Sequence, residues 1–156
     1  MTLVVQDLDE CKPVFEASLP AELKDRVSFV VHNFFNPQPV SADIYLLKMI
    51  LHDWPDESAV QIIQALRPGL KHGARVILFE YIGNQDEEGK KTLPRTMQQM
   101  GTATDVRLMA LFNGKERPVE AWKEVFAKAD ERFEVVNVKA DPVTFFAIVE
   151  AEWKER

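Results

Sequence analysis

Short apolar runs alternate with helical patterns of apolar residues along this chain. The runs are rich in β-branched and aromatic residues and are bounded by Gly, Pro, Asn or Asp, as strands are. They predict strands at residues 3–6, 27–31, 42–47, 75–81, 133–139 and 144–150. Helical spacing predicts helices between them, at residues 8–17, 55–67, 92–112 and 118–129, the third with a kink or break near Gly101.

Strands that alternate with helices are typical of an α/β fold with a mostly parallel sheet. The last two strands are joined by the short connection Ala140-Asp141-Pro142, which predicts a terminal antiparallel hairpin. A chain of 156 residues has the size of one compact domain, so we expect a single domain over residues 1–156.

Composition narrows the classes of function. The net charge is -6 and the basic residues are scattered, which argues against a nucleic-acid or membrane surface, because both attract clustered Lys and Arg. Cys11 is the only cysteine, so it cannot form an internal disulfide, and a reducing compartment is expected. The sequence shows no leader pattern and no apolar segment of membrane-spanning length, which predicts a soluble, cytoplasmic protein.

Polar residues recur at or just past the ends of the predicted parallel strands: Asp7, Asn33, Lys48 with His52, and Glu80. In open α/β sheets, ligands bind outside the carboxyl ends of the strands. These residues should therefore share one rim of the sheet.

His52 is the candidate with the clearest chemistry, since histidine exchanges a proton near neutral pH and a neighbouring carboxylate can fix its tautomer. Glu80 or Glu116 could be that carboxylate. Equally, His52 could cap the helix that begins at Pro55 or lie on a surface loop. The residues alone leave both interpretations open.

A resemblance adds weight to the catalytic interpretation. It rests on Leu47-Lys48-Met49-Ile50-Leu51-His52-Asp53-Trp54, on the strand that ends in Glu80, and on Asn113-Gly114-Lys115-Glu116-Arg117. Together these are similar to the S-adenosylmethionine-dependent O-methyltransferases that modify phenolic and polyketide compounds in plants and fungi. The resemblance implies that His52 is the general base that deprotonates the substrate hydroxyl, bracketed by Glu80 and Glu116.

The same resemblance implies a cofactor site and a Rossmann-like sheet. S-adenosylmethionine would meet Asp7 at its ribose, Asn33 and Phe34 at its adenine, and Lys48 near its methionine end. Asn33 departs from the family's usual aspartate. The strand and glycine turn that hold the cofactor in the family, and the amino-terminal domain that builds its dimer, have no counterpart in the sequence.

The absent strand would be central, so the sheet is expected to be incomplete. Unpaired buried backbone groups cost about 1 to 3 kcal/mol each. We therefore expect a repair, either by movement of the strand at 3–6 beside the strand at 44–47 or by strand exchange with a second subunit. The Met-rich surface between Met97 and Met109, which the amino-terminal domain covers in the family, favours a homodimer.

Three functions follow. The favoured one is a cofactor-independent acid/base cyclase or isomerase acting on a phenolic or polyketide secondary metabolite, with His52, Glu80 and Glu116 as catalytic residues. The second is a truncated, split or intersubunit S-adenosylmethionine-dependent O-methyltransferase. The third is a non-catalytic binding or regulatory relative.

Contacts with the small aromatic substrate are expected from Met109 and Phe112, which immediately precede the Glu116 motif, and from Asp53. No metal site is expected, because the three histidines are far apart in sequence and differently placed.

Overall fold

The computed structural model describes residues 1–81, 95–140 and 146–154. The strands are β1 Leu3–Asp7, β2 Val27–Val31, β3 Ile44–Lys48, β4 Arg75–Tyr81, β5 Phe133–Ala140 and β6 Phe146–Trp153. The helices are α1 Lys12–Ser18, α2 Asp56–Ala65, α3 Arg95–Phe112 and α4 Val119–Ala129. Short 3₁₀ turns cover Asp9–Cys11, Ala21–Leu23, Leu51–Asp53 and Arg67–Gly69.

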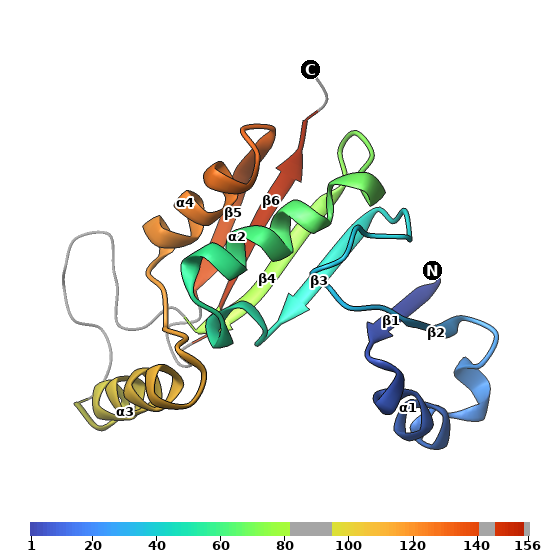
Figure 1. The fold of residues 1–156 in the computed structure, drawn as a ribbon, viewed down its shortest axis with the longest axis horizontal. Helices are drawn as coiled ribbons and strands as arrows, with labels where there is room; N and C mark the ends of the chain where they lie inside the picture. Colours follow the sequence, from blue (N-terminus) through green and yellow to red (C-terminus); the bar gives the residue numbers. More distant parts are fainter. Residues whose placement is uncertain (82–94, 141–145, 155–156) are drawn as a thin grey trace.

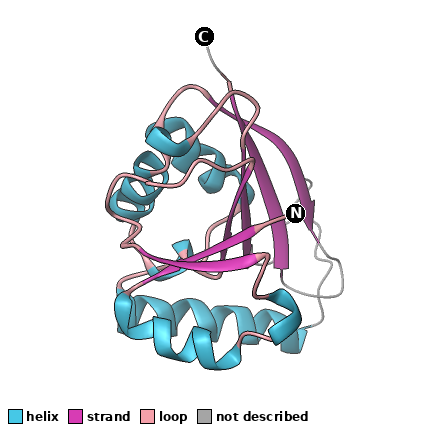
Figure 2. Ribbon diagram, turned by 90° about the vertical axis from the view of Figure 1, so that its right-hand side faces the viewer, coloured by secondary structure: helices cyan, strands magenta, loops and turns pink. Residues whose placement is uncertain are grey.

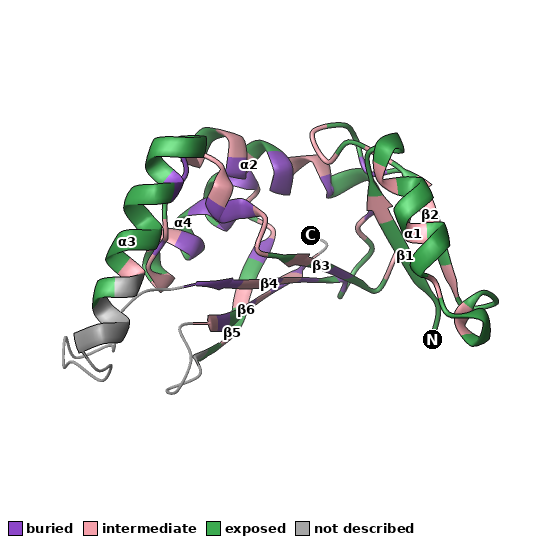
Figure 3. Ribbon diagram, turned by 90° about the horizontal axis from the view of Figure 1, so that it is seen from below, coloured by how far each residue is buried: buried purple, intermediate pink, exposed green. Residues whose placement is uncertain are grey.

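The main sheet has the strand order β3-β4-β6-β5. β3 pairs with β4 in parallel, whereas β6 is antiparallel to both β4 and β5. Helices α2 and α4 lie over one face of this sheet (Figure 1). Figure 3 shows buried positions gathered between these helices and the strands, where Trp122, Phe126, Ile62 and Ile63 are fully buried. The α/β fold and the terminal antiparallel pair are thus confirmed.

A second, smaller sheet contains only β1 and β2, paired in parallel with Asp7 opposite Val31. Figure 2 views the molecule from the side on which β1 and β2 lie, and there these two strands cross the direction of the main-sheet strands. The side-chain amides of Gln6 on β1 and Gln38 on the connection to β3 exchange two hydrogen bonds, of 2.7 and 2.8 Å. The backbone N–H of Gln38 donates in turn to the carbonyl of Ala65, which ties this connection to α2.

The predicted movement of the first strand beside β3 is wrong. β1 pairs with β2 through the local crossover that contains α1, and in the described part of the chain no ladder joins β1 to β3. The local pairing satisfies one edge of β1 over its full length, so the strand gains little from moving. Strand exchange with a second subunit stays a prediction.

Several apolar side chains remain exposed on the open edges and on α3. Ile44 and Leu46 of β3 are 57% and 64% exposed, and Leu3, Val4 and Val5 of β1 are also exposed. The predicted break in the third helix is wrong, since α3 runs through Gly101 as a continuous helix. A Cβ atom at Gly101 would lie 2.0 Å from the hydroxyl oxygen of Tyr81, so this glycine serves a close approach rather than a break.

Two segments named in the sequence expectations lie outside the described residues. They are part of the helix predicted from residue 92 and the hairpin connection at 141–145, and the side chains of Met97 and Met100 are not described either. The other element boundaries agree with the predictions to within a few residues, and β6 extends three residues beyond the predicted end at Glu150.

Candidate active site

His52 lies on the 3₁₀ turn Leu51–Asp53, which follows β3 at the rim of the main sheet. Between strand and turn, Met49 has a φ of 55°, a left-handed conformation that is uncommon for residues with a side chain. The Met49 N–H donates to the carbonyl of Phe79 on β4 at 2.9 Å. The chain is therefore held to β4 where it leaves the strand, and His52 is buried rather than exposed on a loop.

Glu80 lies near the end of β4 and is completely buried. Its Oε1 accepts hydrogen bonds from the backbone N–H groups of Ile50 at 3.2 Å and Leu51 at 2.9 Å. Its buried Oε2 has no hydrogen-bond partner among the described residues. Burial raises the pKa of Glu80 to about 6, although the two N–H groups act in the opposite direction. Glu80 thus binds the turn through one oxygen and can hold a proton on the other.

Glu116 supplies the closest carboxylate to the histidine. Its Oε1 lies 3.2 Å from Nδ1 of His52, and both side chains are less than a tenth exposed. An ionised carboxylate can only accept, so in the neutral imidazole Nδ1 donates to Glu116 and Nε2 is the basic nitrogen. Asp53 lies on the other side, with Oδ1 3.6 Å from Nε2.

The three carboxylates set the basicity of His52. Burial alone would lower the pKa of His52, but the hydrogen bond that His52 donates to Glu116 and the negative charges of Glu80, Glu116 and Asp53 outweigh burial and raise the pKa above 6.5. A raised pKa makes the imidazole a stronger base. The arrangement is therefore suited to removing a proton from a weakly acidic group, with the resulting imidazolium stabilised by Glu116.

The loop that carries Glu116 packs directly against the His52 turn. The Lys115 N–H donates to the carbonyl of His52 at 2.9 Å, and the Glu116 N–H donates to Oδ1 of Asp105 on α3 at 2.8 Å. A Cβ atom at Gly114 would lie 2.2 Å from that same carbonyl of His52. Only glycine allows this close approach, which explains why a glycine stands at position 114.

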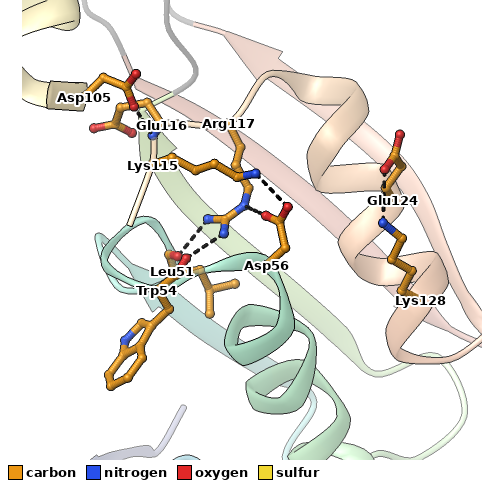
Figure 4. A network of polar contacts seen from close by, with 9 residues as sticks. All are labelled: Leu51, Trp54, Asp56, Asp105, Lys115, Glu116, Arg117, Glu124 and Lys128. Carbon is orange, nitrogen blue, oxygen red and sulfur yellow. Dashed lines mark hydrogen bonds and ion pairs between the residues drawn. The ribbon is translucent and has the colours of Figure 1, made fainter. Parts of the chain in front are cut away.

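Arg117 is a site residue that sequence reasoning did not assign. Its side chain is fully buried and donates to Oδ1 of Asp56, to the carbonyl of Leu51 and to the carbonyl of Trp54 (Figure 4). Asp56 is the first residue of α2, and its carboxylate pairs with both Arg117 and Lys115. Arg117 belongs to the motif that suggested Glu116, and that proximity was the available signal.

Tyr81 follows Glu80 and is also buried. Burial, together with the nearby charge of Glu116, raises the pKa of Tyr81 to about 12. Its phenol therefore keeps its proton at neutral pH beside the two glutamates.

The residues assigned to the cofactor lie at the rims of both sheets. Asp7 and Asn33 are brought near each other by the β1–β2 pairing; each is exposed, and each carboxylate or amide oxygen accepts from a nearby backbone N–H. Phe34 packs against Trp54, with ring centroids 5.9 Å apart, and so connects the β2 rim to the His52 turn. Lys48 lies at the end of β3, with its Nζ 5.4 Å from the centroid of the Phe79 ring.

The residues assigned to the substrate lie beside this turn or on the end of α3. Met109 and Phe112 are 60% and 51% exposed in the last turns of α3, and Asp53 faces His52 as described. Their role as substrate contacts stays a prediction. Within the described ranges, no three His, Cys, Asp or Glu side chains are arranged to hold a metal ion, and no helix is long and apolar enough to cross a membrane.

Comparison with known proteins places this site in a family. The family model of the O-methyltransferase domain matches residues 1–131. The chain is 42% identical over 152 residues to the O-methyltransferase AMT9 of Alternaria alternata, covering 97% of this chain and 35% of that protein. It is 36% identical over 155 residues to the O-methyltransferase lcsG of Purpureocillium lilacinum, covering 99% and 33%. The chain thus spans about a third of the length of these relatives.

Solved structures agree. LepI in complex with S-adenosylmethionine matches with a TM-score of 0.81 and 25% identity, over 99% of this chain and 36% of that one, and a structure described as that of a pericyclic reaction enzyme matches with the same values. NcsB1, an O-methyltransferase from neocarzinostatin biosynthesis in complex with S-adenosylhomocysteine and 1,4-dihydroxy-2-naphthoic acid, matches with a TM-score of 0.74 and 28% identity, over 97% and 42%. The motif around His52, the α/β fold and these matches agree, and the chain belongs to the O-methyltransferase domain family.

Proposed function

We propose that this chain carries the hydroxyl-activating part of an S-adenosylmethionine-dependent O-methyltransferase that acts on a phenolic secondary metabolite. The observation that supports it is the buried His52–Glu116 pair, 3.2 Å apart, at the rim of the sheet. The family and its relatives favour methyl transfer over the cofactor-independent chemistry expected from the sequence.

The chain's own residues account for the acid–base step. Nε2 of His52 takes the proton of the substrate hydroxyl, while Glu116 holds Nδ1–H and stabilises the imidazolium. A phenol has a pKa of about 10, so a base with a raised pKa at a buried site is needed to make the phenolate at neutral pH. S-adenosylmethionine, when bound, supplies an electrophilic methyl group to the phenolate oxygen.

The residues at the β1 and β2 rims fit that cofactor in chemistry. The carboxylate of Asp7 can accept from ribose hydroxyls, the amide of Asn33 can pair with the adenine edge, and Phe34 with Trp54 offers aromatic surface for a purine. Lys48 lies at the end of β3, on the rim of the other sheet, and would meet the methionine end of the cofactor. The related structures of LepI and NcsB1 are complexes with S-adenosylmethionine and S-adenosylhomocysteine, respectively.

Calorimetry and a product assay test the proposal. The chain is titrated with S-adenosylmethionine and then incubated with this cofactor and 1,4-dihydroxy-2-naphthoic acid. We expect saturable binding and a product heavier by one methyl group, and we expect the His52→Gln variant to bind the cofactor but form almost no product. His72→Gln is the matched control, because His72 is exposed and precedes β4 at the end opposite Glu80. Equal product from wild type and His52→Gln, or no cofactor binding by wild type, would contradict the proposal.

A second candidate is acid–base cyclisation or isomerisation without methyl transfer. The match to a solved pericyclic reaction enzyme, with a TM-score of 0.81 and 25% identity, favours it. The incubation repeated without cofactor distinguishes the two. A product isomeric with the substrate, formed by wild type and lost in His52→Gln, supports this candidate. Binding of phenols that is the same in both proteins, with no product, supports the non-catalytic alternative.

A further inference from the structure

Two fully buried charged side chains, Glu80 and Arg117, form hydrogen bonds with the backbone of the turn that carries His52. Glu80 binds N–H groups of this turn, and Arg117 binds its carbonyl groups. Glu80 accepts from the N–H groups of Ile50 and Leu51. Arg117 donates through Nη1 to the carbonyl of Leu51 at 2.9 Å and through Nη2 to the carbonyl of Trp54 at 2.6 Å (Figure 4). The backbone on both sides of His52 is therefore fixed by side chains from β4 and from the loop between α3 and α4.

A guanidinium is required for the hydrogen bonds that Arg117 forms. Its planar array of donors lets Nε bind Oδ1 of Asp56 at 2.8 Å while the two terminal nitrogens bind the two carbonyls. The ring of Trp122 lies 5.0 Å from the guanidinium carbon and adds a cation–π contact. Asp56 compensates the buried charge. A lysine at this position has one nitrogen and cannot reach all three acceptors in the same geometry.

Arg117 is also the immediate neighbour of Glu116, so the same residue that fixes the His52 turn fixes the backbone next to the carboxylate. Lys115, on the other side of Glu116, binds the carbonyl of His52 through its N–H and Asp56 through its Nζ. The residues before and after Glu116 are thus both bonded to the His52 turn or to Asp56, and together they fix the distance between the imidazole and Glu116.

We propose that Arg117, anchored by Asp56, is a positioning residue that sets the His52–Glu116 geometry. Its role in catalysis rests on the proposed function, whereas its effect on His52 does not. Arg117 touches neither substrate nor the reacting atoms; it acts through the turn and through Glu116.

The test uses the histidine signals of the full chain in NMR titrations, where His32 and His72 serve as internal references. The variants are Arg117→Lys and Asp56→Asn, the second chosen because its site is partly exposed and the fold should tolerate it. In both we expect the pKa of His52 to fall, because burial persists while the bond to Glu116 loosens, and the other two histidines to be unchanged. We also expect kcat to fall about 100-fold with KM unchanged, as misplacement of a catalytic group typically produces.

Arg132→Lys is the matched control. Arg132 also binds a carboxylate, Asp130, through two nitrogens and covers a tryptophan, Trp153, but it lies at the start of β5 away from His52. It should leave the pKa of His52 and kcat unchanged. An unchanged His52 titration in both folded variants would overturn the proposal. A shifted titration in a protein whose wild type shows no methyl transfer would leave the positioning role intact and reject the proposed function instead.

Discussion

Nδ1 of His52 lies 3.2 Å from Oε1 of Glu116, across 64 positions of sequence. The contact forms because the loop after α3 packs on the turn after β3, through the Lys115 N–H and the bare Cα of Gly114. The base, His52, and the carboxylate that orients it, Glu116, therefore come from two different segments that meet at one buried junction, the contact between the turn after β3 and the loop after α3.

Replacing Glu116 with Gln should lower the rate of methyl transfer by about 10²- to 10⁴-fold, the usual contribution of a positioned acid–base group. The amide has no charge to stabilise the imidazolium, so the pKa of His52 should fall. The rate of wild type should rise with pH through the raised pKa of His52, since the neutral imidazole is the base, and the midpoint should move to lower pH in the variant. A pH–rate profile measures both effects.

Glu120→Gln is the control for this change, because Glu120 is an exposed glutamate paired with Lys123 on α4. It should leave the profile as in wild type. A Glu116→Gln profile that coincides with that of wild type would show that Glu116 does not act on His52.

The pKa of Glu80 predicts a dependence of stability on pH. In the folded chain the pKa of Glu80 is about 6, whereas in the unfolded chain the carboxyl releases its proton near the ordinary pKa of 4.5. Because the folded state binds more protons between these values, the free energy of unfolding should fall as pH rises through this window, by about 2 kcal/mol from Glu80. Urea unfolding at a series of pH values measures the slope.

Glu80→Gln should remove that slope. The amide oxygen can still accept from Ile50 and Leu51, but the group no longer ionises, so the variant should be more stable than wild type at neutral pH by about 1 to 2 kcal/mol. A variant that is less stable than wild type at pH 7 and keeps the slope would assign the slope to other groups.

A contact between Gly101 and Tyr81 should appear as coupling between the two positions. Gly101→Ala places a Cβ 2.0 Å from the Tyr81 hydroxyl and should destabilise the chain by about 1 to 3 kcal/mol, as overpacking does. Adding Tyr81→Phe removes the oxygen that clashes and should recover part of the loss. A double-mutant cycle in chemical unfolding gives the coupling, and strict additivity would rule the contact out.

The exposed edge of β3 should support self-association. Ile44 and Leu46 are largely exposed, and an open apolar strand edge pairs readily with another chain. Sedimentation at increasing concentration should show a dimer, and Leu46→Lys should weaken it. Val14→Lys on α1 is the control, since Val14 is equally exposed on a helix. A monomer at all concentrations would contradict both the dimer and strand exchange.

The sequence carried much of the fold and part of the site. The runs around β4 and α4 predict their elements because local periodicity reflects one-sided burial, and the three residues that the motifs singled out, His52, Glu80 and Glu116, lie at one junction. The partner of β1 and the grip of Arg117 could not be found in this way. Both depend on which distant backbone groups come to lie nearby, and neither leaves a periodic pattern.

Gly101 is another position where the local sequence pattern does not reveal a tertiary contact. Its low helix propensity predicted a break, but the helix continues through it, and its bare Cα lies close to the hydroxyl of Tyr81 on a different element. Local propensity alone therefore does not end the helix at this position.

The amide pair of Gln6 and Gln38 links the small sheet to the connection that leads to β3, and this link does not depend on pH. Neither side chain ionises, so acidification or added salt, which alter the carboxylates around His52, leave this link almost unaffected. The β1–β2 unit and the rim it carries can therefore keep one orientation over the pH range in which the histidine changes its charge. The position of Asp7 and Asn33 on this rim should therefore not depend on the charge of His52.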